Sequence, residues 1–209
     1  MTALSQILEH KIVAILRGMP SSEIIPIAKA LYKGGIRIME ITLNSENALA
    51  AIEQLSHEFE NRMLIGAGTV IDINNAKNAI AAGAKFIISP SLDAAVIKAT
   101  KDENLVSIPG AFTPTEIVAA HKFGADIIKI FPCLNAAYVK NILAPLNHIK
   151  VMPTGGINAG NIQEYAASGA VAFGIGSTLV HNDTVNEHYL QQLTAKATAL
   201  TGALKKATA

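Results

Sequence analysis

The feature that most constrains the fold is a regular alternation of strand-like and helix-like segments. Short runs rich in β-branched residues begin at positions 12, 38, 64, 86, 105, 127, 150 and 172. They follow one another at roughly 19–26 residues, the spacing expected when each strand is followed by a helix. Most runs are apolar on both faces, which is typical of a parallel sheet covered by helices. Eight such units favour closure into a barrel.

The segments between the runs carry recognisable helix ends. Thr113 is predicted to be an N-cap, with Pro114 at the first helical position and Glu116 completing a capping box. Pro26 falls inside a helical stretch and is expected to kink or shorten that helix. Four helices are expected to stop at a glycine in the left-handed conformation, at KGGI (33–36), AAGAKF (81–86), KFGADI (122–127) and ASGAVAF (167–173).

These signals predict the fold class. We expect residues 1–209 to form one domain, a single (β/α)8 TIM barrel with an N-terminal helix. The alternative is an open doubly wound sheet, but no GxGxxG motif follows the first strand to support it. In a barrel, the catalytic groups come from the C-terminal ends of the strands and from the loops that follow them.

Composition excludes several classes of protein. The chain has 17 basic and 16 acidic residues, a net charge of +1, and no basic run, so nothing indicates nucleic-acid binding. Cys133 is the single cysteine, which excludes an intrachain disulfide and suits a reducing compartment. The apolar run near the N-terminus is too short for a membrane span and follows charged residues. We therefore expect a soluble, cytoplasmic protein.

A lysine lies in the middle of the apolar stretch DIIKIFPC (126–133). By the two-residue period of a strand, Lys129 shares a face with Ile127 and Phe131, so it projects into the barrel if that face points inward. Because an unpaired buried charge is costly, this position needs an explanation. Glu40 occupies a similar place in the second strand, and Arg17 ends the first.

The chemistry of a desolvated lysine supplies one explanation. A free lysine has a pKa of about 10.4, and burial favours the neutral amine. A neutral amine attacks a ketone to form a Schiff base, whose protonated form accepts electrons from a breaking carbon–carbon bond. Glu40 would supply the acid and base that these proton transfers require. No metal or cofactor is needed, and we predict none.

Two glycine-rich segments follow the last two strands. These are PTGGI (153–157) and GIGST (174–178). Loops at this position of an eight-stranded α/β barrel often hold phosphate through backbone N–H groups. Thr154 and Ser177 would add hydroxyl donors. The two loops therefore predict a phosphorylated small molecule as the ligand.

Other candidates are weaker, and two alternatives remain open. The six histidines are scattered, with no pair at the i, i+4 spacing of a metal site, and Cys133 suits a small buried hydrophobe better than a nucleophile. The first alternative is a phosphosugar isomerase-type barrel without imine chemistry. The second is a non-catalytic ligand-binding barrel in which Lys129 and Glu40 form a structural salt bridge. A reducible adduct with a keto acid distinguishes the Schiff-base mechanism from the isomerase-type barrel.

The motifs VAILRG, GGIRIMEITLNS, LIGAGTV, FIISPS, SIPGAFTPTE, IIKIFP, PTGGI and GIGS resemble, in this order, those of the 2-keto-3-deoxy-6-phosphogluconate (KDPG) and 4-hydroxy-2-oxoglutarate (KHG) aldolases. The resemblance extends from about residue 5 to about residue 200. It implies a class I aldolase with a (β/α)8 barrel, usually a homotrimer. Such an enzyme cleaves KDPG to pyruvate and glyceraldehyde 3-phosphate, and in some members KHG to pyruvate and glyoxylate.

The resemblance also assigns roles to residues. It implies that Lys129 forms the Schiff base and that Glu40 is the general acid and base. Thr69 corresponds to the contact for the pyruvoyl carboxylate, and Pro90 and Phe131 correspond to residues that line the pocket. The phosphate contacts fall on Gly155, Gly156, Gly176 and Ser177.

One position departs from part of the family. Some members carry an arginine four residues after the glutamate, where this chain has Asn44, a neutral group that cannot bind a carboxylate bidentately. A branch that includes phosphogalactonate aldolases has asparagine there and an arginine ending the first strand, as at Arg17. We assign the substrate carboxylate to Arg17 with Thr69. This leaves 2-keto-3-deoxy-6-phosphogalactonate open as the alternative substrate, and KHG cleavage open as well.

Overall fold

The structure is a computed structural model that describes residues 1–181 and 184–208. Its strands form two parallel sheets, one with the order β5-β4-β3-β2-β1-β9 and one with the order β6-β7-β8. The strands are β1 (Ile12–Leu16), β2 (Ile38–Thr42), β3 (Leu64–Gly68), β4 (Phe86–Ile88), β5 (Val106–Ile108), β6 (Gly110–Ala111), β7 (Ile128–Ile130), β8 (Val151–Pro153) and β9 (Phe173–Ile175).

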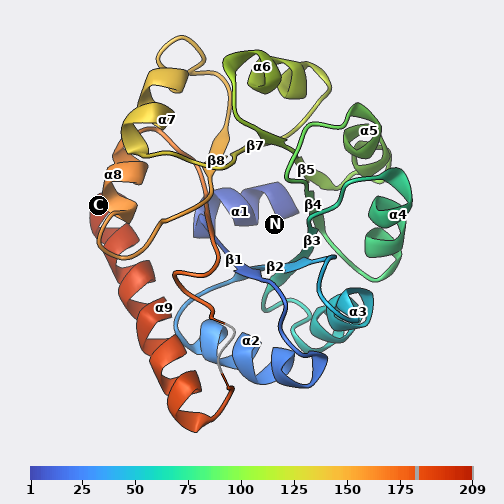
Figure 1. Cartoon of the computed structure of the whole chain (residues 1–209), viewed down its shortest axis with the longest axis vertical. Helices are drawn as coiled ribbons and strands as arrows, with labels where there is room; N and C mark the ends of the chain where they lie inside the picture. Colours follow the sequence, from blue (N-terminus) through green and yellow to red (C-terminus); the bar gives the residue numbers. More distant parts are fainter. Residues whose placement is uncertain (182–183, 209) are drawn as a thin grey trace.

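The two sheets meet at two places. Pro109 alone separates β5 from β6, and its carbonyl still accepts a hydrogen bond from the Lys129 N–H at 2.9 Å. At the other junction, Thr154 after β8 forms a parallel bridge with Gly174 in β9. The strands curl around a common centre with the helices outside them (Figure 1). Within each sheet the strands follow chain order, and the last strand, β9, pairs with the first, β1, which the order of an open doubly wound sheet does not allow.

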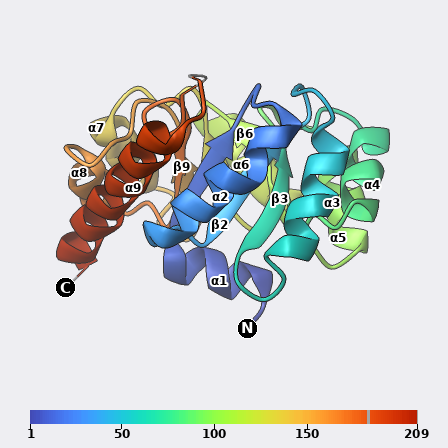
Figure 2. The same ribbon diagram turned by 90° about the horizontal axis from the view of Figure 1, so that it is seen from below.

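The helices lie outside the curled sheet, except for the first (Figures 1 and 2). They are α1 (Ala3–His10), α2 (Ile24–Lys33), α3 (Ala48–Glu58), α4 (Ile73–Ala81), α5 (Ala94–Asp102), α6 (Pro114–Lys122), α7 (Ala136–Leu143), α8 (Ile162–Ala167) and α9 (Glu187–Thr208), with a 3₁₀ turn at Ser21–Glu23. Within the two described ranges, none of the helices combines the length and the apolar character that crossing a membrane requires.

The local signals fold as expected, with one correction. Thr113 and Glu116 form the predicted capping box, with Pro114 in the first turn. The predicted effect of Pro26 was wrong, because α2 begins at Ile24 and runs unbroken to Lys33. Pro26 therefore lies in the first turn, where a missing N–H costs no intrahelical hydrogen bond. The glycines that end four helices have positive φ angles, at Gly35, Gly83, Gly124 and Gly169.

Two hydrophobic clusters hold the strands in place. The larger one fills the space between strands and outer helices. The smaller one, which we call the inner cluster, consists of one residue of α1 and apolar side chains that face inward from the strands or from the residue just before a strand: Ile7, Val13, Ile38, Leu64, Phe86, Ile88, Val106, Ile108, Ile127, Met152 and Ala172. Gly66 leaves space for the Phe86 ring, since a Cβ there would lie 2.4 Å from it.

Helix α1 closes one end of the curled sheet. Ile7 is fully buried in the inner cluster, and Figure 2 shows α1 lying across the end of the strands. In Figure 1 the same helix lies behind the strands, at their N-terminal ends. The site must therefore be sought at the opposite end, where the strands finish.

Candidate active site

Lys129 and Glu40 are both buried inside the ring of strands. Ile38 and Ile127 belong to the inner cluster, so the two-residue period places Glu40 and Lys129 on the same inward faces, one layer higher. Lys129 is 3% exposed and Glu40 is fully buried. The Lys129 Nζ lies 4.9 Å from the centroid of the Phe131 ring. The predicted lysine and glutamate therefore share one lumen.

Glu40 is an unusual carboxylate. Within the described residues, neither of its oxygens has a hydrogen-bond partner. Burial raises the pKa of Glu40, and the positive charges of Lys129 and Arg17 oppose that increase without cancelling it. A carboxyl group whose pKa is raised keeps its proton to a higher pH than an exposed one, which suits it to donate and accept protons in a reaction.

Gly68 creates the space that Glu40 occupies. A Cβ atom on Gly68 would lie 1.6 Å from the Glu40 Oε1 and 2.3 Å from its Cδ, which no real Cβ tolerates. Gly68 faces inward because Leu64 of the same strand belongs to the inner cluster. Sequence reasoning did not single out Gly68, although the two-residue alternation of side chains along β3 places Gly68 on the inward face of the strand.

The hypothesis of a structural Lys–Glu salt bridge is not supported. Among the described residues, ion pairs within 4.0 Å join Lys29 to Glu58, Lys98 to Asp102, and Lys101 to Asp126. Lys129 and Glu40 form no such pair. Two groups held in one lumen without neutralising each other are available for a ligand.

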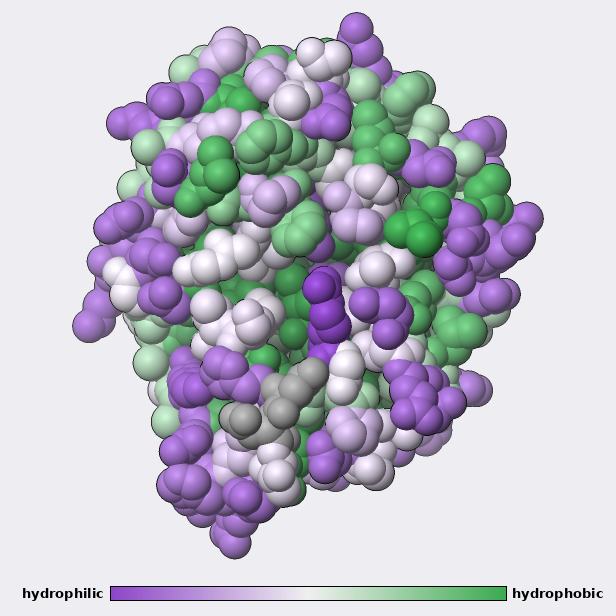
Figure 3. Space-filling view, in the orientation of Figure 1, coloured by the Kyte–Doolittle hydropathy of each residue, from purple (hydrophilic) through white to green (hydrophobic). Residues whose placement is uncertain are grey.

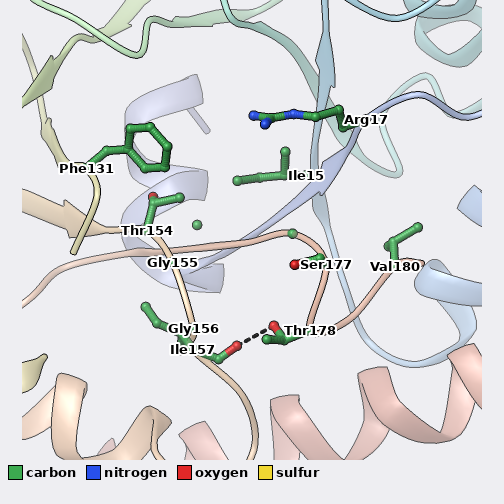
Figure 4. A pocket seen from close by; sticks show the side chains of 12 residues that line it. Ile15, Arg17, Phe131, Thr154, Gly155, Gly156, Ile157, Ser177, Thr178 and Val180 are labelled. Atoms are coloured by element: carbon green, nitrogen blue, oxygen red, sulfur yellow. Dashed lines mark hydrogen bonds between the residues drawn. The ribbon is translucent and has the colours of Figure 1, made fainter. Parts of the chain in front are cut away.

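A cavity of about 430 Å³ opens at the C-terminal ends of β1, β8 and β9. Lys129 and Glu40 do not line it themselves, but Phe131, which contacts Lys129, does. Figure 3 shows this face of the molecule hollowed near its centre, and Figure 4 shows the lining residues. Of the predicted site residues, the cavity brings together Arg17, Phe131, Thr154, Gly155, Gly156, Gly176 and Ser177. Residues that sequence reasoning missed complete the lining: Ile15, Ile157, Gly174, Thr178 and Val180.

The backbone of the cavity depends on glycine. Gly155 and Gly156 have φ angles of +121° and +67°, which strongly favour glycine. Nothing lies within 4 Å of the place where a Gly156 Cβ would stand, so the backbone is open to a ligand. The Thr178 hydroxyl donates a hydrogen bond to the Ile157 carbonyl and joins the two glycine-rich loops (Figure 4).

Thr154 points into the ring and lacks a partner. Its hydroxyl is buried without a hydrogen bond within the described residues. A Cβ on Gly174 would lie 2.2 Å from that hydroxyl, so Gly174 makes room for it. A buried hydroxyl without a partner is available to hydrogen-bond a polar ligand.

Arg17 is exposed at the end of β1, and its neighbours are tied to the loop after β2. The Thr42 hydroxyl donates to the Leu16 carbonyl at 3.3 Å and lies 3.0 Å from the Ser45 hydroxyl. The Ser45 hydroxyl accepts from the Gly18 N–H at 2.8 Å. Both peptide groups that flank Arg17 are thereby held, while its side chain extends over the cavity toward Phe131 (Figure 4).

Other predicted residues lie at the same end of the strands but do not line the cavity. Thr69 directly follows β3 and has a φ of +58°, so it lies outside the strand. Pro90 follows β4 and packs against Gly110. Asn44 is exposed after β2. Cys133 is half-buried, and burial raises the pKa of its thiol, which makes it a poor nucleophile.

Metal ligands do not gather in the part of the chain that the structure describes. No group of three or more His, Cys, Asp or Glu side chains is close enough there to hold an ion.

Comparison with known proteins assigns the family. The sequence profile of the KDPG and KHG aldolases matches residues 4–196. The chain belongs to this family. The 2-dehydro-3-deoxy-phosphogluconate aldolase of Treponema pallidum is 36% identical over 174 residues, which cover 82% of each chain. A probable 2-dehydro-3-deoxy-6-phosphogalactonate aldolase of Rhizobium meliloti is 35% identical over 175 residues, again 82% of each.

The solved structures agree with the sequence relatives. A KDPG aldolase from Legionella pneumophila, with pyruvate captured as a covalent carbinolamine, has a TM-score of 0.85 and 30% identity, covering 95% of this chain and 98% of its own. Membership of the KDPG and KHG aldolase family makes this protein an aldolase, a lyase that acts on carbon–carbon bonds.

Proposed function

We propose that this protein is a class I aldolase that cleaves KDPG to pyruvate and glyceraldehyde 3-phosphate through an imine on Lys129. The observation that carries the proposal is one lumen that contains a buried lysine and a buried glutamate without an ion pair between them. A glycine-lined cavity of a size suited to a small ligand lies at the same end of the strands and is lined by Phe131, the ring that Lys129 contacts.

The reaction begins at the C2 ketone. The neutral amine of Lys129 adds to C2 and gives a carbinolamine. The protonated Glu40 donates a proton to the departing hydroxyl, water leaves, and an iminium ion remains. The raised pKa of Glu40 supports this role, because a buried carboxyl group keeps its proton to a higher pH than an exposed one.

Bond cleavage then uses Glu40 as a base. Its carboxylate removes the proton from the C4 hydroxyl, the C3–C4 bond breaks, and the electron pair moves to the iminium nitrogen as an enamine forms. The aldehyde carries the phosphate away. The Glu40 acid reprotonates C3, and water hydrolyses the imine to release pyruvate and return Lys129 to the free amine.

Substrate binding divides between two ends of the site. We assign the carboxylate to Arg17 and Thr69, since an arginine offers a bidentate donor. The Thr154 hydroxyl, which is buried and unpartnered, suits a hydroxyl group of the sugar chain. Phe131 lines the cavity, and Pro90 is assigned to the substrate pocket on family resemblance. The phosphate is assigned to the backbone N–H groups and hydroxyl of Gly155, Gly156, Gly176 and Ser177.

The identity of the sugar acid is a narrower proposal. We favour KDPG, while the Rhizobium meliloti relative is named for the galactonate epimer and supports that alternative. Asn44 removes one cation from the site, so we expect KHG, which has a second carboxylate and no phosphate, to be cleaved less well. The ratio of kcat/KM values for the two C4 epimers and for KHG decides between the three.

The architecture suggests further expectations. We propose that β5 and β6 are one strand interrupted at Pro109, which makes the whole chain a single (β/α)8 barrel domain with the N-terminal helix α1. A homotrimer in the cytoplasm is proposed on family resemblance. Light scattering on the purified protein measures the oligomeric state, and a single cooperative unfolding transition would support one domain.

Borohydride reduction in the presence of pyruvate tests the mechanism. We expect a stable adduct on Lys129, located by peptide mass spectrometry, and none in Lys129→Met. Lys98→Met is the matched control, because Lys98 is exposed on the outer helix α5 and lines no part of the cavity. A folded protein that forms no adduct would contradict the imine mechanism and favour the isomerase-type alternative.

A further inference from the structure

A second and larger cavity lies at the opposite end of the strands from the proposed active site. Its volume is about 930 Å³, within the range of pockets that hold small molecules. One wall is the outer side of α1, and the other consists of the segments that lead into β2, β3, β4 and β5. The reaction proposed above uses none of the residues that line it.

Cations dominate the lining of this cavity. Arg37, Arg62 and Lys85 each precede a strand, β2, β3 and β4 respectively, and His10 ends α1. Glu60 is the one acidic residue among the described residues of the lining. Three permanent positive charges against one negative charge give the cavity a net positive field.

The two arginines are fixed in a row with aromatic rings. The Arg37 guanidinium lies 4.1 Å from the Tyr32 ring centroid, Tyr32 and Phe59 are 6.2 Å apart, and Arg62 lies 5.1 Å from Phe59. Arg37 Nη1 donates to the carbonyls of Tyr32 and Ile36 at 2.8 and 2.9 Å. Arg62 Nη2 donates to the Glu58 carbonyl. Stacking and these bonds use one edge of each guanidinium and set its orientation.

The cations of this cavity lack carboxylate partners within the described residues. A paired cation does occur at the same end of the strands, where Lys101 bonds Asp126 at 2.7 Å before β7. Lys29 and Lys98 are likewise paired with Glu58 and Asp102. Arg37, Arg62, Lys85 and Glu60 appear in none of these pairs.

A structural explanation covers part of this arrangement. Arg37 and Arg62 hydrogen-bond carbonyls at the ends of α2 and α3, where a cation interacts favourably with the helix dipole. That explanation accounts for the positions of Arg37 and Arg62, each taken separately. It does not require a cavity between them, and it does not involve Lys85, whose side chain forms no hydrogen bond among the described residues.

We propose that this cavity is a binding site for a small polyanion that carries phosphate groups, separate from the active site. Oriented guanidinium groups bind phosphate oxygens through paired N–H donors, and Lys85 adds a mobile point charge. The proposal does not depend on the activity of the aldolase, because it concerns residues at the other end of the strands.

Calorimetric titration of the full-length protein with tripolyphosphate tests the site. In about 0.15 M salt, which screens weak surface attraction, we expect saturable binding that weakens at least about tenfold in Arg62→Gln and in Lys85→Gln. Lys77→Gln removes one exposed charge from α4 and is the matched control. Arg37→Gln should weaken binding as well. If that variant does not fold, Arg37→Lys replaces it, because lysine keeps the positive charge but lacks the paired N–H donors of the guanidinium.

The phosphate loops of the active site also attract polyphosphate, so they must be separated from this cavity. Ser177→Asp places a negative charge in those loops. Binding that persists in Ser177→Asp and weakens in Arg62→Gln supports the proposal. The proposal is overturned if the wild-type protein does not bind tripolyphosphate, if only Ser177→Asp loses binding, or if Lys77→Gln loses as much as Lys85→Gln.

Discussion

At the scale of single residues, Gly68 matters as much as the groups that carry charge. Its missing Cβ is the space in which the Glu40 carboxyl lies. Glu40 and Lys129 were predictable because a charged residue in an apolar strand departs from its surroundings. Gly68 was not, because a glycine in a strand has several ordinary explanations, and only the position of the Glu40 side chain distinguishes among them.

We predict that Gly68→Ala lowers kcat by about 100-fold, the usual effect of displacing a reacting group by about 1 Å. Steady-state kinetics measures it. Gly66→Ala is the matched control on the same face of β3, since its Cβ would press on the Phe86 ring instead. Both variants should lose about 1–3 kcal/mol of stability through overpacking. Equal kcat values in the two variants would show that Gly68 does not position Glu40.

Glu40 also gives stability a dependence on pH. Its pKa is raised in the folded protein above the ordinary value of 4.5, so the folded state binds this proton more tightly than the unfolded chain. The resulting stabilisation is complete below pH 4.5 and is lost as the pH rises through the folded pKa.

The free energy of unfolding of the wild-type protein should therefore fall relative to that of Glu40→Gln as the pH rises from about 4 to about 8. Urea unfolding at a series of pH values measures the difference, and Glu53→Gln, on α3, is the control. A difference that does not change with pH would mean that Glu40 ionises as freely as an exposed carboxylate.

At the scale of elements, the loops after neighbouring strands hold one another in place. Sequence periodicity predicted the strands and the glycines that end helices, because these depend on local geometry. It did not predict the interruption at Pro109 or the left-handed Thr69, which depend on contacts between strands. The hydrogen bonds that join Thr42 and Ser45 to Gly18 were likewise not predictable, since they connect residues of different βα units.

We predict that Ser45→Ala raises KM by about tenfold and leaves kcat within about twofold. Without the Ser45 hydroxyl, Arg17 would be displaced, which weakens substrate binding equally in the ground and transition states. Ser45→Thr keeps the hydroxyl and should restore KM. Steady-state kinetics on the phosphorylated substrate decides it. A loss of stability in Ser45→Ala with an unchanged KM would assign Ser45 a structural role alone.

At the scale of the whole molecule, α1 is part of the core. Ile7 is fully buried in the inner cluster, among side chains from the strands. The sequence predicted an N-terminal helix but not its place, since an amphipathic helix can cover any apolar surface. Its position follows from the parallel strands, which leave an apolar opening at their N-terminal ends.

We predict that Ile7→Ala lowers the free energy of unfolding by about 2–5 kcal/mol, the range for truncating a buried isoleucine. Chemical denaturation measures the change. Ile71→Ala, at a side chain that is 58% exposed, should change it by less than about 0.5 kcal/mol. Similar small effects in both variants would mean that α1 lies against the strands without contributing to the stability of the core.

Closure by α1 has a consequence for the order of events. Helix α1 and the inner cluster fill the N-terminal end of the lumen beneath Lys129, so in the proposed mechanism a molecule attached to Lys129 leaves past the loops that follow β8 and β9. In that mechanism the phosphorylated aldehyde lies between the lysine-bound fragment and this exit after cleavage. We therefore predict that the aldehyde departs first and pyruvate second. In the synthetic direction we predict the reverse order, in which an aldehyde that enters before pyruvate blocks the access of pyruvate to Lys129.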